Sequence, residues 1–248
     1  MNHRMAFIYR PVAAAIAVTG LLMCVPSVSR GSFLTFYTSP SDFSAAAPGL
    51  PVETFSGAVT FGPNYYVTHS SPISSATNDA VIPAGTILPG LSVTTLNPGL
   101  VSSALEIQGS GSNPKAVGTN WFQDTLILDF APAVSAVGEN VLGNVYPGPS
   151  FAGRVTEQVY SGSTLLGSTN LSEAAGAGGY IGVASPTADI TSIDLLFTPS
   201  ADTDSNTYVS NVSFGAAVVP EPSSVALLAA GGLWILLRRR RGTGSPAD

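Results

Sequence analysis

Between residues 31 and 219, no window of about 11 residues or more shows a sustained helical repeat of apolar side chains. Short runs rich in Val, Ile, Leu, Thr and aromatic residues recur instead, separated by Gly, Pro, Asn and Ser. The 26 Gly and 19 Pro are too many for a helical protein. This pattern predicts an all-β fold, a β-sandwich or jelly roll. The expected strands are Phe33–Tyr37, Val52–Phe55, Val59–Phe61, Tyr65–Thr68, Leu91–Thr95, Ala104–Ile107, Thr125–Phe130, Ala133–Gly138, Arg154–Tyr160, Thr164–Ser168, Tyr180–Val183, Ile190–Phe197 and Tyr208–Phe214.

Two local signals refine this expectation. Ser161-Gly162-Ser163 between two strand-like runs predicts a hairpin. Ser39 followed by Pro40 and Asp42 resembles a helix start, with Ser39 as N-cap and Pro40 at the first helical position. Pro48-Gly49 would end that helix. We therefore expect one short helix near the start of the domain.

The charges are distributed unevenly along the 248 residues, whose formal net charge is −6. Between 31 and 219 the only bases are Lys115 and Arg154, whereas all the acids but Glu221 and Asp248 lie there. A middle this acidic excludes ordinary nucleic-acid binding, which needs a basic face. The single cysteine, Cys24, lies before this region, so no disulfide, thiolate nucleophile or cysteine-based metal site is expected in it.

The N-terminus has the three parts of a secretory signal peptide. Arg4 and Arg10 form a basic region, Val12–Met23 is apolar, and Ser27-Val28-Ser29 offers small residues for cleavage after Ser29. We therefore assign residues 1–29 as signal peptide. A permanent N-terminal anchor and a lipoprotein modified at Cys24 are the alternatives.

The C-terminus has an apolar run, Val225–Leu237, followed by Arg238, Arg239, Arg240 and Arg241. As a helix this run is about 20 Å long, shorter than a hydrocarbon core of about 30 Å. The prolines just before it and the paired glycines within it weaken a regular helix. The arginines are expected to stop transfer and stay in the cytoplasm, which places the domain on the outside. We therefore predict a marginal single transmembrane helix.

Pro220-Glu221-Pro222, the short apolar run and the arginine cluster together resemble the PEP-CTERM sorting signal of Gram-negative bacteria. The resemblance covers residues 218–241. It implies recognition by an exosortase, a transpeptidase-like membrane enzyme, and a link to exopolysaccharide and biofilm matrix. A plain tail anchor is the alternative.

The middle region also resembles, in outline, an exported domain found ahead of such signals. The resemblance rests on Phe36-Tyr37-Thr38 through Asp42-Phe43, on Val52-Glu53-Thr54-Phe55, and on the closing run from Tyr208 to Gly215. Members of that family often have an acid-Asn pair in the last strand, where this chain has Ser210-Asn211. That departure argues against a calcium or ligand role at this strand.

One segment has the spacing of a weak calcium candidate. Asp202, Asp204 and Asn206 offer oxygen ligands at alternate positions, which suits Ca²⁺. An EF-hand is excluded, because Thr207 and Ser213 stand where it needs Gly and Glu. A looser calcium loop or a solvated acidic turn remains, and no other metal or cofactor is expected.

Catalytic signals are sparse. His69 is the only imidazole after the signal peptide, so a histidine zinc site lacks ligands and a serine triad would depend on this residue. The alternative is a loop or surface histidine beside Ser70 and Ser71. A glycosidase needs two carboxyl groups, and no motif selects a pair. The candidates in or beside strands are Glu53, Glu106, Asp124, Asp129, Glu139 and Glu157.

Aromatic residues are the remaining clue to a ligand. Several of them could form a stacking surface for sugar rings, which pack on apolar faces that carry polar handles. We favour the alternative that most of them fill the core between two sheets. The residues concerned are Tyr65, Tyr66, Trp121, Phe122, Tyr146 and Phe151.

The sequence thus predicts four segments: a signal peptide at 1–29, a β-sandwich ectodomain at 30–217, a sorting signal at 218–241 and a tail at 242–248. We expect a non-enzymatic surface or matrix protein that is structural or binds polysaccharide, with a secreted carbohydrate-active enzyme as the alternative. Expected partners are the Sec machinery, signal peptidase, an exosortase and exopolysaccharide, and no nucleic acid. The expected route is an inner-membrane-anchored intermediate, then the cell surface or matrix of a Gram-negative bacterium.

Overall fold

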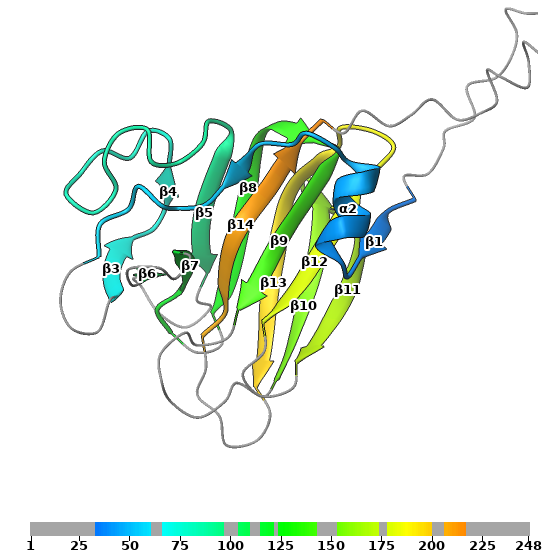
Figure 1. The fold of residues 1–248 in the computed structure, drawn as a ribbon. Helices are drawn as coiled ribbons and strands as arrows, with labels where there is room; N and C mark the ends of the chain where they lie inside the picture. The colour runs from blue at the N-terminus through cyan, green and yellow to red at the C-terminus, as the bar shows by residue number, and fades with distance from the viewer. Residues whose placement is uncertain are drawn as a thin grey trace, which may run out of the picture. The chain divides into compact units, whose positions relative to one another are not determined.

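The computed structural model describes residues 33–60, 66–96, 104–109, 115–121, 124–142, 153–173, 178–199 and 206–216. These residues form one short helix and a series of strands (Figure 1). Their bounds are β1 Thr35–Tyr37, α2 Pro40–Ala46, β2 Val52–Glu53, β3 Tyr66–Ser70, β4 Ile73–Ser74, β5 Leu91–Leu96, β6 Ala104–Gln108, β7 Ala116–Thr119, β8 Thr125–Val134, β9 Ala136–Leu142, β10 Gly153–Ser161, β11 Thr164–Glu173, β12 Gly179–Ala184, β13 Ile190–Pro199 and β14 Tyr208–Gly215.

The strands build two antiparallel sheets that pack face to face, which confirms the all-β sandwich. The larger, sheet A, has the order β1-β12-β9-β14-β7-β6-β3, with β2 also paired to β14. The smaller, sheet B, has the order β11-β10-β13-β8-β5-β4. Neighbours in these orders are mostly distant in sequence, as in Greek-key and jelly-roll topologies.

Period-two alternation along the strands supplies the core between the sheets. Val137 and Val141 of β9 face inward from sheet A, and Val155 and Val159 of β10 face inward from sheet B. All four are fully buried. The segment between β4 and β5 adds Ile82 and Ile87 to the same core. Apolar burial of this kind is the main stabilising contribution to a domain without disulfides.

Helix α2 lies against the outer face of sheet A, over β12 and β1 (Figure 1). Phe43 is its buried residue and packs between the rings of Tyr37 and Tyr180. Pro40 occupies the first turn as expected. Ser39 is the N-cap residue, but its hydroxyl contacts the Ser41 hydroxyl at 2.7 Å and does not bond the helix backbone. Ser39 and Pro40 therefore hold the expected positions and the helix is present, but Ser39 makes no side-chain cap bond.

Several strand bounds differ from the expected ones. Val59 and Thr60 form no strand, and Val59 makes a single backbone bond of 2.8 Å to the Val81 carbonyl. Strands β4 and β7 were not expected, because each is short and lacks a run of β-branched or aromatic residues. The hairpin between β10 and β11 is present, and its two-residue turn has Gly162 at a φ of +57°.

No helix among the described ranges is long and apolar enough to cross a membrane. The predicted signal peptide, the calcium candidates Asp202 and Asp204, and the whole C-terminal signal with its expected transmembrane helix lie outside those ranges.

Candidate functional site

The outer face of sheet B is a broad polar surface. On β10, β13, β8 and β5 every second side chain points into the core, so the intervening ones point outward. All of these outward residues retain exposure, and most are polar. They are Arg154, Thr156, Gln158 and Tyr160 on β10, Ser192, Asp194, Leu196 and Thr198 on β13, Thr125, Ile127 and Asp129 on β8, and Ser92, Thr94 and Leu96 on β5.

Asp194 lies near the middle of this face and directly opposite Gln158 of the neighbouring strand. Its carboxyl has no hydrogen-bond partner among the described residues. Partial burial, and next the charge of Asp129, raise the pKa of Asp194 to about 6. A half-exposed carboxyl with a raised pKa and no partner is unusual on a flat sheet, where acids are normally solvated or paired.

Asp129 is the second carboxyl of the face. It pairs in register with Ser192 on one side and Ser92 on the other, which places it diagonally from Asp194. Diagonal neighbours lie about 7–8 Å apart between Cα atoms. Partial burial raises the pKa of Asp129, whereas a hydrogen bond with the Thr94 side chain lowers it.

Polar side chains continue this surface across β10. The Tyr160 hydroxyl donates to Oε1 of Gln158 at 2.8 Å, and the Thr156 hydroxyl donates to Oδ1 of Asn170 on β11 at 2.8 Å. The bond from Tyr160 orients the Gln158 amide and leaves its nitrogen without a partner in the described part of the chain. The face therefore presents carboxylate acceptors, an amide donor and a half-exposed aromatic ring side by side.

The sequence did not single out Asp194, Gln158 or Tyr160. The alternation of Thr156, Gln158 and Tyr160 with buried residues is visible in the sequence and marks an exposed row. That β13 and β8 lie beside this row is a property of the topology, and no local pattern contains it.

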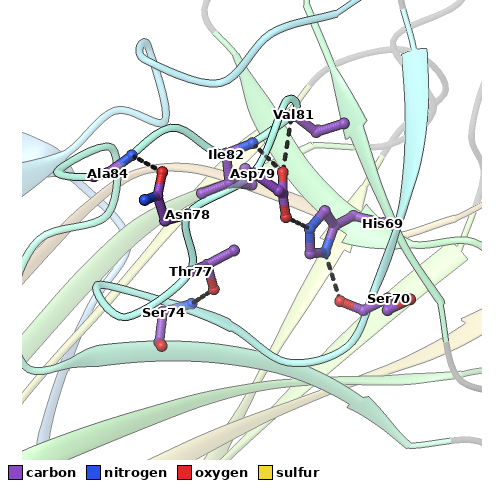
Figure 2. Close-up of polar contacts among 9 residues, drawn as sticks. All are labelled: His69, Ser70, Ser74, Thr77, Asn78, Asp79, Val81, Ile82 and Ala84. Atoms are coloured by element: carbon purple, nitrogen blue, oxygen red, sulfur yellow. Dashed lines mark hydrogen bonds and ion pairs between the residues drawn. The ribbon is translucent and has the colours of Figure 1, made fainter.

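His69 is held in place on both of its ring nitrogens (Figure 2). Nε2 lies 2.7 Å from Oδ2 of Asp79, and Nδ1 lies 2.6 Å from the carbonyl oxygen of Ser70. Both ring nitrogens are therefore occupied by protein oxygens. Neither is left to take a proton from a serine, so this arrangement does not support the catalytic alternative for His69.

Asp79 organises the segment between β4 and β5 (Figure 2). Its Oδ1 accepts from the backbone N–H groups of Val81 at 2.8 Å and Ile82 at 2.9 Å. The hydrogen bond from His69, followed by those two backbone bonds, lowers the pKa of Asp79 to about 2. Asn78 adds a bond from the N–H of Ala84 at 3.2 Å. These contacts give His69 and Asp79 a structural role in fixing a segment without regular structure.

Three of the six candidate acids hold neighbouring groups. Glu53 accepts from the N–H of Phe55 at 2.5 Å and from that of Leu88 at 2.7 Å. Glu106 accepts from Nε2 of Gln108 at 2.5 Å. Asp124 accepts from the Thr95 hydroxyl at 3.4 Å. All three acids are buried, and their partners are protein groups, so their evident role is structural.

Glu139 and Glu157 are brought together in the core, one from each sheet, and both are fully buried. No substrate can reach them in this conformation. Of the six candidates, Asp129 alone lies on a solvent-facing surface, with Asp194 as its neighbour.

The predicted aromatic platform is only partly described. Tyr66 and Trp121 are 43% and 50% exposed, so neither fills the core as we favoured. Tyr66 is level with Gln108 at one end of β6, whereas Trp121 follows β7 beyond the other end, where Asn120 bonds Ala104. These two rings therefore do not form one patch. Tyr65, Phe122, Tyr146 and Phe151 lie outside the described residues.

Asn206 is the one calcium candidate within the described residues, and it is 7% exposed. Its amide nitrogen donates to the Tyr208 hydroxyl at 3.3 Å, and its Oδ1 has no partner there. The described ranges contain no group of three His, Cys, Asp or Glu residues placed to hold a metal ion. Calcium binding with Asp202 and Asp204 stays a prediction.

Residues 218–241 match the family model of the PEP-CTERM protein-sorting motif. The match includes Pro220, Glu221 and Pro222 and the arginines from Arg238 to Arg241, as predicted. The chain therefore carries the sorting signal of an exported protein, a signal that implies processing by exosortase-type machinery. No curated protein matches the chain.

Solved structures resemble the fold at low similarity. CsCBM6-3 from Clostridium stercorarium, in complex with cellobiose, is 17% identical, with 60% of this chain and 95% of that chain covered and a TM-score of 0.31. A family 43 arabinoxylan arabinofuranohydrolase from Bacillus subtilis is 17% identical, with 50% and 24% covered and a TM-score of 0.29. TmCBM61 in complex with β-1,4-galactotriose is 11% identical, with 50% and 86% covered and a TM-score of 0.23. Likeness at this level carries no statement about ligand or activity.

Proposed function

We propose that this exported protein binds a neutral polysaccharide through the outer face of sheet B, and that it does so without catalysis. The observation that carries the proposal is Asp194, a half-buried carboxyl with no partner among the described residues, set between Gln158 and Asp129 on an open sheet face. The sorting signal supports a location outside the cytoplasm, where polysaccharide is available.

The chemistry of the face suits the hydroxyl groups of sugars. Carboxylates accept hydrogen bonds from hydroxyls, the Gln158 amide donates to them, and the Tyr160 ring offers an apolar body with a polar end. Bonds between charged and neutral groups are stronger than those between neutral groups alone. Half-buried Asp129 and Asp194 therefore favour a ligand rich in hydroxyl donors.

The same charges select against acidic sugars. Asp129 and Asp194 already repel one another, which contributes to the raised pKa of Asp194. Arg154 is the one basic side chain on the described part of this face, and it lies near the end of β10. A uronic acid placed over the two carboxyls would add a third negative charge with no nearby cation.

The non-catalytic part of the proposal rests on the placement of the other groups. Glu139 and Glu157 are closed to solvent, and both nitrogens of His69 are occupied. The remaining alternative is a carbohydrate-active enzyme that uses Asp129 and Asp194. Release of reducing ends from polysaccharides that the wild-type chain binds, abolished in Asp194→Asn, would establish that alternative.

The direct test is a glycan-array measurement with the full chain, with and without calcium. Binding of neutral glycans is expected, with a loss of at least about tenfold in Asp194→Asn, since truncating a charged hydrogen-bond partner typically costs that much or more. Asp42→Asn removes a carboxyl from α2 on the opposite layer and serves as the matched control. Equal binding by Asp194→Asn and Asp42→Asn would show that the outer face of sheet B is not the binding site.

We propose the same export and sorting route that the sequence predicts. The Sec machinery and signal peptidase admit the chain, the marginal helix and Arg238–Arg241 hold it at the inner membrane, and an exosortase releases it to the surface or matrix. Replacing Pro220, Glu221 and Pro222 by alanine is expected to block the change in size and location of the mature protein. Unchanged processing would refute this route.

A further inference from the structure

Two glutamates face each other inside the sandwich. Glu139 lies on β9 of sheet A and Glu157 on β10 of sheet B, and the side chains of both are fully buried. The residue opposite Glu139 on β12 is Ile181, and the residue opposite Glu157 on β13 is Leu195. Both of these belong to the apolar core. A pair of acids thus replaces an apolar contact between the sheets.

Apart from the carboxyl of the other glutamate, no described group offers a hydrogen bond to the four carboxyl oxygens of this pair. The two described bases lie elsewhere. Arg154 is exposed on the outer row of β10, and the Lys115 ammonium donates to the carbonyl oxygens of Ser56 and Ala58. Two ionised carboxylates in this setting would be uncompensated, because nothing nearby repays the loss of their hydration.

Protonation removes this conflict. A protonated carboxyl is a hydrogen-bond donor, so one shared proton supplies the bond that four acceptor oxygens lack. Burial, and next the charge of Glu157, raise the pKa of Glu139 well above its usual range. Burial also raises the pKa of Glu157 to about 7. Both pKa values are raised, as expected for two buried carboxyls that face each other and titrate together.

The titratable groups on the strands around the pair point elsewhere. Tyr180 of β12 belongs to the cluster under α2, on the outer face of sheet A, and burial followed by the charges of Glu139 and Glu157 raises its pKa. Asp194 of β13 and Tyr160 of β10 lie on the outer face of sheet B. Tyr208 of β14 bonds Gln108 on the outer side of sheet A. Three other titratable groups lie on the described inner faces, and each has its own partners. Glu53 of β2, level with Val212 of β14, accepts from the N–H groups of Phe55 and Leu88. Asp124 accepts from the Thr95 hydroxyl, and His69 is bonded to Asp79 and Ser70.

We propose that Glu139 and Glu157 form a proton-binding site between the two sheets, which fastens them while a proton is shared and loosens them when both carboxyls ionise. The proton is the ligand, and β9 and β10 are the elements it joins. This makes the stability of the exported domain respond to the acidity of its surroundings, whichever ligand the outer face of sheet B takes.

The raised pKa values of the two glutamates determine how the stability of the domain changes with pH. In the unfolded chain each glutamate titrates near the ordinary glutamate pKa of 4.5. Below that pH both states are protonated, and the full contribution of the pair to stability is present. Stability is then lost as the pH rises through the pKa of Glu157, at about 7. The domain is therefore expected to be more stable in mildly acidic than in alkaline conditions.

The test compares urea unfolding of the full chain between about pH 5 and about pH 8 in two forms. Because Asp194 titrates in the same window, both forms carry Asp194→Asn. The urea concentration at the unfolding midpoint is expected to fall as the pH rises in the form with native glutamates. The form with Glu139→Gln and Glu157→Gln has no proton to release from the pair, so most of that loss should disappear. An equal loss in both forms overturns the proposal.

Two further measurements keep the proposal falsifiable if the glutamine form does not fold. Carbon-13 NMR of the side-chain carboxyls in the wild-type chain should show two glutamates that titrate well above the ordinary range, and ordinary titration of every glutamate overturns the proposal. Added calcium should leave the midpoint at about pH 8 unchanged. A calcium-dependent gain that needs Glu139 and Glu157 would identify a cation site in place of the proton site.

Discussion

Gly118 of β7 lies directly opposite Tyr208 of β14, and the Tyr208 ring covers the place where a side chain on residue 118 would begin. A Cβ built there would stand 2.8 Å from the ring carbon Cγ, closer than real contacts allow. The Tyr208 ring is itself fixed by bonds from Gln108 at 2.7 Å and Asn206 at 3.3 Å. Moving the ring aside would disturb both bonds, and the backbone carbonyl oxygen of Thr207 also obstructs the same position.

We expect Gly118→Ala to lower the free energy of unfolding by about 1–3 kcal/mol, because it overpacks a buried contact. Urea unfolding monitored by tyrosine fluorescence measures this. Gly162→Asn is the control, since Gly162 has open space around it and a φ of +57° that asparagine tolerates. Equal stability of wild type and Gly118→Ala would show that β7 and β14 adjust freely.

Phe43 is the main contact of α2 with sheet A. It is 2% exposed, and its ring centre lies 5.8 Å from that of Tyr37 and 5.9 Å from that of Tyr180. Phe43→Ala is expected to cost about 3–5 kcal/mol, the usual range for removing a buried ring. Hydrogen exchange should then be faster in α2 than in sheet B. Ser44→Ala, which removes an exposed hydroxyl bonded to the Pro40 carbonyl of the same helix but no contact with the sheet, is the control. Equal exchange in both variants would contradict this prediction.

Asp79 is expected to control the segment between β4 and β5. Because its folded pKa of about 2 is depressed, its stabilising contribution is present above the ordinary aspartate pKa of 3.8 and is lost as the pH falls toward 2. Asp79→Ala should accelerate amide exchange at Val81 and Ile82, because their N–H groups donate hydrogen bonds to the Asp79 carboxylate. Asp42→Asn should leave those two amides unchanged. Slow exchange at both amides in Asp79→Ala would show that other contacts hold the segment.

Local patterns predicted the strands better than their partners. The hairpin at Gly162 and the long runs such as Ile190–Phe197 have the right type and nearly the right bounds, because alternation and turn residues are local. Strand β7 was missed because Ala116–Thr119 contains a glycine, which lowers strand propensity. A glycine is needed at position 118 because the Tyr208 ring packs against it. That contact is distant in sequence, so the residues around Gly118 give no sign of it.

The same limit applies to the candidate sites. Glu139 and Glu157 both stood among the candidate acids, but their pairing depends on β9 and β10 lying in opposite sheets. Asp194 and Gln158 become neighbours only through the register of β13 on β10. In contrast, the sorting signal needs no fold, because an ordered motif, apolar run and arginine cluster are recognised in sequence. Its recognition from sequence is confirmed by the match over residues 218–241.

Asp194 gives the outer face of sheet B a pH response of its own. Its folded pKa of about 6 is raised above the ordinary aspartate value of 3.8, so its contribution to stability is present below about pH 3.8 and is lost as the pH rises through about 6. Asp194→Asn removes a partly buried charge and, with it, the repulsion from Asp129, so it should raise the urea midpoint at about pH 8 while leaving it unchanged at about pH 4. Half of the group is exposed, so the gain is expected to be modest and to shrink in high salt. Gln158→Ala, on the opposite strand, changes no charge and should show no such pH-dependent difference. A midpoint for Asp194→Asn equal to wild type at every pH would mean that solvent already screens the two carboxyls.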